Sequence, residues 1–258
     1  MKVVILAGGL GTRIAEETET RPKPMVEIGG KPILWHIMKG YSHYGFNDFI
    51  ICLGYKGYLI KEYFMHYYMH NSDITIEMSN NKVDIHFTNA ESFKVTLVDT
   101  GLSTKTAGRL KRVEKYLDGN DFMLTYGDGV ADVDFKELVN FHQSHNKLAT
   151  VTAIQPEARF GGLDIGENGQ VENFKEKPKG DGKWINGGFF VLKQQVFNLL
   201  KGSMDDIMWE DGPMESLATS RQLMAYRHQG FWKCMDAMRD KLELEALWQN
   251  KQAKWKTW

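Results

Sequence analysis

The amino-acid sequence predicts an α/β fold of three layers, in which a mainly parallel mixed sheet is flanked by helices. Two observations carry this prediction. Apolar runs near residues 2–7, 48–53, 95–99, 121–126 and 149–154 have the length and composition of strands that are buried on both faces. Segments with helical spacing of apolar residues lie between several of these runs, and this alternation favours parallel pairing of the strands.

The helical segments have recognisable ends. The first spans residues 32–44, with Pro32 in a first-turn position and Gly45 directly after its end. Apolar residues recur three and four positions apart in further segments, at 56–69, 107–117 and 134–145. Residues 235–249 predict one more strongly periodic helix.

The chain changes character after about residue 155. Asn168 and Gly169 separate two short apolar segments, 163–165 and 171–174, which predicts a hairpin. Residues 187–192 form a further apolar run. There is no internal repeat and no Ser/Pro-rich linker, so we expect one domain over residues 1–258. Its first half, about 1–150, is regular, and its second half, about 151–258, is less so.

Composition limits the function classes. The formal net charge of −1 argues against broad binding to nucleic acid or to an anionic membrane. The two cysteines, Cys52 and Cys234, are far apart and lack metal-ligand spacing. The opening apolar run is too short for a signal peptide, and no stretch approaches the length of a membrane span. We therefore expect a cytoplasmic protein.

The clearest functional signal lies at the start of the chain, where an apolar run passes directly into the segment 8–13. Its glycines allow a tight turn whose backbone N–H groups can approach an anion. Arg13 adds a guanidinium group, and Lys23, held between two prolines, adds a point charge that suits phosphate. The glycine spacing matches neither the dinucleotide loop nor the P-loop. The segment predicts another kind of phosphate site, with a purely structural turn as the alternative.

Two aspartates are candidate functional acids. Asp128 follows the apolar run 122–126 and lies between two glycines that leave its carboxylate unshielded. A turn aspartate that bonds its own backbone is the structural alternative there. Asp236 precedes the last helical segment, where aspartate is also favoured as an N-cap.

These motifs resemble the sugar-1-phosphate nucleotidylyltransferases. Residues 6–13 and 22–25 match the superfamily, and segments 27–38, 126–132, 176–182 and 185–190 resemble its glucose-1-phosphate cytidylyltransferase branch. The resemblance covers nearly the whole chain. It implies the Rossmann-like nucleotide-diphospho-sugar transferase fold, with nucleotide bound by the first half and sugar phosphate by the second.

The resemblance also implies a nucleotide site and a metal site. The nucleotide site would comprise Leu6, Ala7, Gly8, Gly9, Leu10, Gly11, Thr12, Arg13, Lys23, Thr104, Arg109 and Asp128. Asp128 and Asp236 together would hold Mg²⁺, an ion that is commonly bound by one or two carboxylates plus substrate phosphates. An oxygen of the sugar phosphate would attack the α-phosphorus. That oxygen is already ionised near pH 7, so no general base is required.

The sugar site is implied in the same way. Lys177 would hold the sugar phosphate and Glu176 would accept hydrogen bonds from sugar hydroxyls, although a solvated loop is the alternative for this charged segment. The residues lining the ring would be Gly162, Asn186, Gly187 and Gly188. The implied catalytic set is Arg13, Lys23, Asp128, Lys177 and Asp236.

The function implied by the resemblance is transfer of a cytidylyl group from CTP to α-D-glucose 1-phosphate, which gives CDP-glucose and pyrophosphate. The product would feed dideoxysugar synthesis for cell-surface polysaccharide such as O-antigen. A uridylyl- or thymidylyltransferase on the same scaffold, or a non-catalytic regulatory subunit that binds nucleotide sugars, are the alternatives. Aromatic residues at 64, 67, 68, 248, 255 and 258 favour either a subunit interface or simple core packing. The resembled enzymes form oligomers, including hexamers, so we expect a homo-oligomer.

Overall fold

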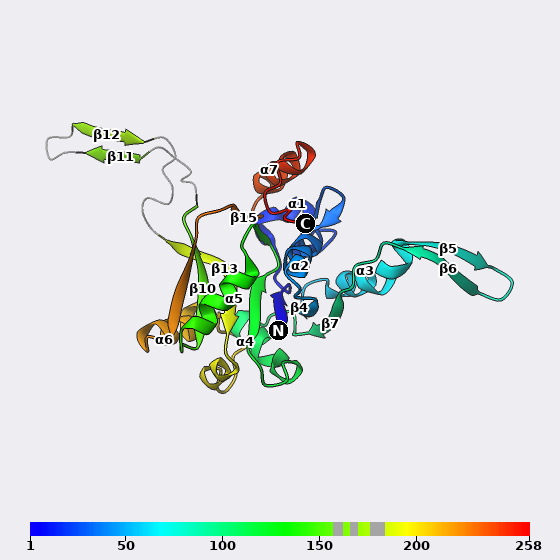
Figure 1. The fold of residues 1–258 in the computed structure, drawn as a ribbon, viewed down its shortest axis with the longest axis horizontal. Coiled ribbons are helices and arrows are strands. Elements are labelled where there is room, and N and C mark those ends of the chain that lie inside the picture. Colours follow the sequence, from blue (N-terminus) through cyan, green and yellow to red (C-terminus); the bar gives the residue numbers. More distant parts are fainter. Residues whose placement is uncertain (157–161, 166–169, 176–183) are drawn as a thin grey trace.

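A seven-stranded sheet forms the centre of the computed structural model, which describes residues 1–156, 162–165, 170–175 and 184–258 (Figure 1). The strand order is β14-β10-β13-β8-β1-β4-β7. The bounds of these strands, in chain order, are β1 Lys2–Leu6, β4 Asp48–Leu53, β7 Lys94–Asp99, β8 Phe122–Tyr126, β10 Ala149–Ile154, β13 Ile185–Leu192 and β14 Leu223–His228.

The sheet is mixed and mostly parallel, as predicted. β1 runs parallel to β4 and β8, β4 to β7, and β10 to β14. Only β13 runs antiparallel to its neighbours, β8 and β10. All five apolar runs that predict strands are strands of this sheet. The carboxyl ends of β1, β4, β7 and β8 therefore meet at one edge, where ligands bind in open α/β sheets.

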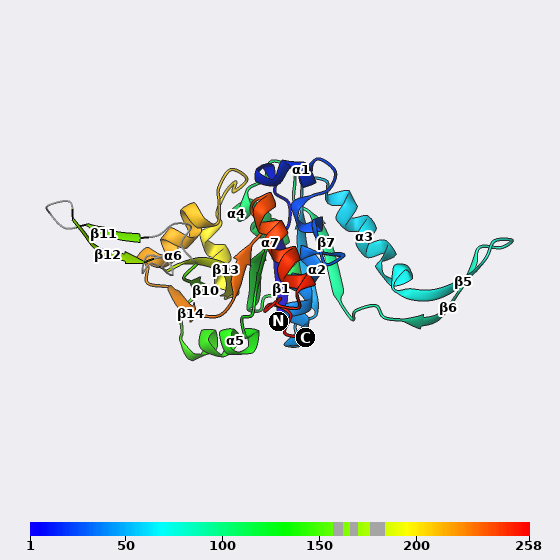
Figure 2. The same cartoon turned by 90° about the horizontal axis from the view of Figure 1, so that it is seen from above.

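Helices cover both faces of the sheet (Figure 2). Val3 and Ile5 face a core formed with α2 Ile33–His43, α3 Gly57–His70, α5 Phe135–Ser144 and α7 Met238–Gln249. Val4 and Leu6 point the other way, toward α4 Thr106–Val113 and α6 Glu215–Thr219. Alternate residues of β1 thus enter two separate cores, which explains the uninterrupted apolar run. The three-layer prediction is confirmed.

The predicted start of the last helix is wrong. Residues 235–237 precede α7, because the chain first forms β15, Trp232–Cys234, which pairs antiparallel with β9, Gly129–Ala131. Asp236 is not the N-cap of α7; Ala237 has that position. The carboxylate of Asp240 accepts the N–H groups of Asp236 and Ala237 over 3.0 and 2.9 Å. The side chain of Asp236 is left available for other partners.

Two hairpins lie outside the central sheet. The predicted one is confirmed: β11, Gly162–Ile165, pairs antiparallel with β12, Val171–Lys175. A second, formed by β5 Ser72–Glu77 and β6 Lys82–Thr88, was not predicted and extends from the end of α3 away from the sheet in both views (Figures 1 and 2). The shorter elements are α1 Ala15–Thr18, the pair β2 Glu27–Ile28 and β3 Lys31–Pro32, the 3-10 turns Thr12–Ile14, Lys23–Met25, Glu114–Tyr116 and Gln194–Leu199, and a π-helical turn Glu210–Met214.

The aromatic residues near the C-terminus belong largely to the core. Trp255 is buried, its ring stacks on Phe231, and its indole Nε1 lies 3.4 Å from Nδ1 of His36. Tyr67 of α3 is also buried and accepts a hydrogen bond from Trp35. Core packing therefore accounts for Trp255 and Tyr67, whereas Tyr68 is exposed.

Candidate active site

The glycine-rich loop follows β1 at the carboxyl edge of the sheet. Gly11 has a φ of +67°, in the left-handed region, and precedes the turn Thr12–Ile14. The hydroxyl of Thr18 donates to the carbonyl of Gly11 over 3.1 Å and holds the loop from outside. A side chain at Gly11 would be strained by this backbone and would meet Thr18. Arg13, which belongs to this turn, lies at the same edge of the sheet as the carboxyl end of β8.

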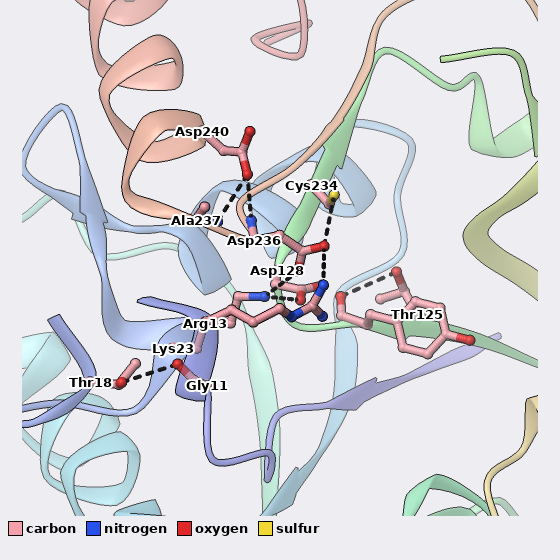
Figure 3. A network of polar contacts seen from close by, with 11 residues as sticks. Gly11, Arg13, Thr18, Lys23, Thr125, Asp128, Cys234, Asp236, Ala237 and Asp240 are labelled. Carbon is pink, nitrogen blue, oxygen red and sulfur yellow. Dashed lines mark hydrogen bonds and ion pairs between the residues drawn. The ribbon is translucent and has the colours of Figure 1, made fainter. Parts of the chain in front are cut away.

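Lys23 is positioned by the prolines that flank it. The residues Lys23–Met25 form a 3-10 turn in which the N–H of Met25 donates to the carbonyl of Pro22 over 2.8 Å. The lysine side chain is only 11% exposed, and its Nζ donates to Asp128 Oδ2 over 2.6 Å and to Asp236 Oδ1 over 2.8 Å. A single ammonium group therefore joins two acids that are far apart in the sequence (Figure 3).

Pairing between β9 and β15 explains why the two acids meet. Asp128 precedes β9, and its carbonyl accepts the N–H of Met235 over 2.8 Å. Cys234 lies opposite Gly129 in the same pair of strands. This register brings Asp236, just beyond β15, beside the turn that carries Asp128 (Figure 3).

The electrostatics of this cluster favour the charged forms of Lys23 and Asp236. Burial would lower the pKa of Lys23, but the charges and hydrogen bonds of Asp128 and Asp236 outweigh it and raise that pKa above its usual value. Burial would raise the pKa of Asp236, but Lys23 and Arg13 lower it further than burial raises it. Arg13 Nη1 donates to Asp236 Oδ2 over 2.9 Å from a side chain that is largely exposed. Two cations thus face two carboxylates at the edge of the sheet.

Arg109 of α4 is buried beneath the glycine-rich loop. Its guanidinium donates to the hydroxyl of Thr100 and to backbone carbonyls of four residues, Gly8, Leu53, Gly101 and Leu102, over 2.8 to 3.3 Å. A Cβ atom at Gly8 would lie 2.1 Å from Arg109 Nη1, so this glycine makes room for the arginine. Arg109 therefore ties together the ends of β1, β4 and β7.

Two cavities open beside these groups. The larger cavity, of about 450 Å³, is lined by the opening loop from Leu6 to Arg13, by Lys23 and Asp128, and by Thr104 and Arg109. Every residue that the resemblance assigns to the nucleotide site therefore lies around one space. The smaller cavity, of about 240 Å³, is lined by Asn186, Gly187 and Gly188 together with Asp236. Arg13, Tyr126 and Asp128 line both cavities, which places the acids and cations where the two spaces adjoin.

Two residues of the predicted sugar site lie outside the residues that the structure describes. Gly162 is the first residue of β11. Glu176 and Lys177 lie outside the described residues. Of the residues predicted to line the sugar ring, Asn186, Gly187 and Gly188 of β13 line the smaller cavity, together with Trp232 of β15.

Sequence reasoning missed several lining residues. Tyr126 borders both cavities, and its position directly before Gly127 and Asp128 could have indicated that it lines the site. Trp232 and Cys234 alternate along β15 and line the smaller cavity, where Trp232 Nε1 donates to the carbonyl of Gly187 over 2.7 Å. Glu210 lines the larger cavity from a distant segment, and no local pattern marked it.

Asp128 and Asp236 fit the binding of a divalent ion. Their carboxylate oxygens already converge on one cation, the ammonium of Lys23, within 2.8 Å. In the part of the chain that the structure describes, no group of three or more His, Cys, Asp or Glu side chains is arranged to hold a metal. Two protein carboxylates are a donor set that Mg²⁺ completes with water and phosphate oxygens, so the set suits an ion that binds together with phosphates.

The chain resembles known proteins over its full length. A family model described as Nucleotidyl transferase matches residues 2–237. A glucose-1-phosphate cytidylyltransferase of Salmonella typhi is 58% identical over 259 aligned residues, which cover 100% of both chains. A mannose-1-phosphate guanyltransferase of Saccharomyces cerevisiae is 30% identical over 98% of this chain and 66% of that protein.

Solved structures agree on the fold. The crystal structure of a UDP-glucose pyrophosphorylase complexed with UDP-glucose matches with a TM-score of 0.69 and 17% identity, covering 97% of this chain and 98% of that one. Among the described residues, no helix combines the length and apolar character needed to cross a membrane.

Nucleotidyltransferases of the matched family generally use a divalent metal. The chain belongs to the nucleotidyl transferase family, and relatives that match it from end to end are glucose-1-phosphate cytidylyltransferases.

Proposed function

We propose that the protein transfers a cytidylyl group from CTP to α-D-glucose 1-phosphate and releases CDP-glucose and pyrophosphate. The observation that carries this proposal is the junction of two cavities at Arg13, Tyr126 and Asp128, with Lys23 and Asp236 bonded to the same cluster. Nucleotidyl transfer needs two anionic substrates side by side, and cations at the junction reduce their repulsion. The 58% identical Salmonella protein supports the choice of substrates.

Each cavity has a proposed occupant. The larger takes CTP, with its phosphates toward the loop 8–13, Arg13 and Lys23. The smaller takes glucose 1-phosphate, whose hydroxyls meet Asn186 and the backbone of Gly187 and Gly188. Gly162, Glu176 and Lys177 remain predicted contacts of the sugar and its phosphate. Trp232 adds an aromatic wall, a surface that suits a sugar ring.

Positioning accounts for the chemistry that this chain has to supply. The attacking phosphate oxygen is ionised near pH 7, so the residues at the junction need to orient it and to compensate charge. Arg13 and Lys23 do so from the side of the glycine-rich loop. Asp128 and Asp236 are proposed to hold Mg²⁺, which supplies charge neutralisation at the phosphates when it is bound. Both acids are paired with Lys23.

A matrix of nucleotides against sugar phosphates tests this function. Pyrophosphate release is measured with CTP, UTP and dTTP, each with glucose 1-phosphate or with mannose 1-phosphate, in the presence of Mg²⁺. We expect CTP with glucose 1-phosphate to be the best pair by at least about tenfold in kcat/KM. A preference for UTP or dTTP would make the protein a different transferase of the same fold. Release from no pair would favour a non-catalytic, nucleotide-sugar-binding subunit.

We further propose a cytoplasmic homo-oligomer, including a hexamer as the assembly to test for. The β5–β6 hairpin exposes Ile76, Met78, Val83, Ile85 and Phe87, and α3 exposes Met65 and Tyr68 beside it. An exposed apolar surface on a protruding hairpin favours burial against another copy of the chain. Light scattering on the full chain tests this: Ile85→Ser with Phe87→Ser should lower the mass of the assembly, and an unchanged mass would exclude the hairpin as the contact.

A further inference from the structure

Glu210 is a carboxylate of the larger cavity that has no role in the proposed phosphate and metal contacts. It begins the turn Glu210–Met214, directly after the fully buried Trp209. Its side chain accepts a hydrogen bond from the hydroxyl of Tyr126, and Thr106 Oγ1 donates to its other oxygen over 3.0 Å. Both donors belong to elements of the sheet and its helix layer, β8 and α4. The carboxylate is therefore held at the wall of the cavity from two sides.

The two donors are themselves fixed. The N–H of Trp209 donates to Thr106 Oγ1 over 2.6 Å, which orients the hydroxyl of Thr106 toward Glu210. Asn186 Nδ2 lies 3.3 Å from the hydroxyl oxygen of Tyr126. The hydroxyl of Tyr126 donates to the carboxylate and is held between Glu210 and Asn186. Each oxygen of Glu210 keeps a further lone pair for a ligand.

The charge of Glu210 limits what it can face. Among the described residues lining the larger cavity, Asp128 and Glu210 are the only carboxylates. Asp128 is paired with Lys23, whereas Glu210 forms no ion pair with any described cation. An uncompensated negative charge beside a triphosphate would repel it. Glu210 must therefore face the uncharged part of the nucleotide, and it offers that part hydrogen-bond acceptors only.

We infer that Glu210 accepts a hydrogen bond from the exocyclic amino group of cytosine and thereby selects CTP over UTP and dTTP. Cytosine presents an N–H₂ donor at its C4 position, whereas uracil and thymine present a carbonyl oxygen there. With either of these bases, two acceptors would face each other and a buried polar atom would stay unpaired. A site built to bond one substrate group rejects an analogue that lacks it. This inference rests on the proposed transfer from CTP and names the residue that reads the base.

Glu210→Gln tests the inference because it keeps the shape of the side chain and adds a donor that a carbonyl can accept. The ratio of kcat/KM for CTP to kcat/KM for UTP is measured with glucose 1-phosphate and Mg²⁺. We expect the ratio to fall about tenfold or more in Glu210→Gln. Asp211→Asn is the matched control: it removes the same charge one residue along the chain, from an exposed side chain outside both cavities, and should leave the ratio unchanged.

The outcomes separate the inference from the function on which it rests. A wild-type protein that does not use CTP overturns the proposed function. A wild-type protein that prefers CTP, with the ratio unchanged in Glu210→Gln, overturns the role of Glu210 alone. A variant that changes the ratio of CTP to dCTP, but not of CTP to UTP, also overturns it, because the carboxylate would then read the ribose. If Glu210→Gln does not fold, Glu210→Asp decides: a shorter carboxylate should lower the ratio, and an unchanged ratio overturns the inference.

Discussion

Asp128 and Asp236 each direct a carboxylate oxygen at the same ammonium group, that of Lys23, over 2.6 and 2.8 Å. Neither acid is close to the lysine in the sequence. The contact depends on the pairing of β15 with β9 and on the proline-flanked turn that carries Lys23. The ammonium group of Lys23 thus lies between the two acids that we propose as ligands of a divalent ion.

Removal of this lysine should strengthen metal binding by the free protein. Lys23→Met keeps the length of the side chain but leaves both aspartates without their common cation. We expect the affinity of the nucleotide-free protein for Mn²⁺, measured by electron paramagnetic resonance, to rise about tenfold. Lys39→Met, which breaks the ion pair with Glu91 elsewhere, should leave it unchanged. An unchanged or weaker Mn²⁺ affinity in Lys23→Met would show that the two acids do not form the metal site.

The acids themselves should control turnover. Asp128→Asn and Asp236→Asn keep the size of each side chain and remove one charge near the bound phosphates. Each is expected to lower kcat by about a hundredfold or more while circular dichroism stays unchanged. Asp205→Asn, at an exposed ion pair with Arg112, serves as the control and should retain kcat. Near-normal rates in both site variants would remove these acids from the mechanism.

Arg109 should stabilise the fold as well as shape the nucleotide cavity. Arg109→Lys cannot reproduce five hydrogen bonds to acceptors at the ends of three strands, so carbonyls of Gly8 and Leu53 lose their buried donor. We expect the free energy of unfolding to fall by about 2–4 kcal/mol in urea titrations. Arg112→Lys, at a more exposed position on the same helix, should cost less than about 1 kcal/mol. Full stability with weakened CTP binding would assign Arg109 to the ligand alone.

His36 should make stability depend on pH. Burial lowers its pKa to about 4, against hydrogen bonding to the carbonyl of Ile28 over 2.8 Å. In the unfolded state this histidine takes up a proton near pH 6.5, whereas in the folded state it stays neutral until the pH approaches 4. The stability that its neutral form contributes is therefore fully present above pH 6.5 and is lost as the pH falls toward 4. Between pH 7.5 and 5, this histidine should account for about 2 kcal/mol of the loss.

Variants separate this contribution from that of other groups. His36→Gln should flatten the pH dependence of the unfolding free energy, because glutamine does not titrate. His66→Gln, at an exposed position on α3, should preserve the slope. An identical slope in wild type and His36→Gln would assign the pH dependence to other residues.

The sequence predicted the central sheet well because its strands carry buried apolar runs. β1, β4 and β8 are each buried on both faces, so composition alone identifies them. The β5–β6 hairpin escaped because nearly all of its side chains are exposed, so it has no apolar run. Its signal was the alternation of Ile74 and Ile76 before a turn at Asn81, whose φ is +56°.

The site was predictable where a motif sits on one turn and unpredictable where distant segments converge. Gly11, Lys23 and Asp128 lie in short motifs whose local sequence already indicates binding of phosphate or metal. The contact of Lys23 with Asp236 depends on the register of β15 with β9, which no local pattern encodes. The start predicted for the last helix was too early for the same reason, because the carboxylate that accepts the N–H of the N-cap residue Ala237 belongs to Asp240 and not to Asp236. Glu210 reaches the cavity only through the packing of its segment on α4.

The most direct test is the position of Mn²⁺ in crystals grown with CDP-glucose, measured by anomalous scattering. The ion is expected at one peak between Asp128 and Asp236, about 2.1–2.3 Å from an oxygen of each, with Lys23 turned toward the phosphates. The nucleotide should fill the larger cavity and the glucose the smaller. A peak away from both carboxylates, or a ligand outside the two cavities, would contradict the account.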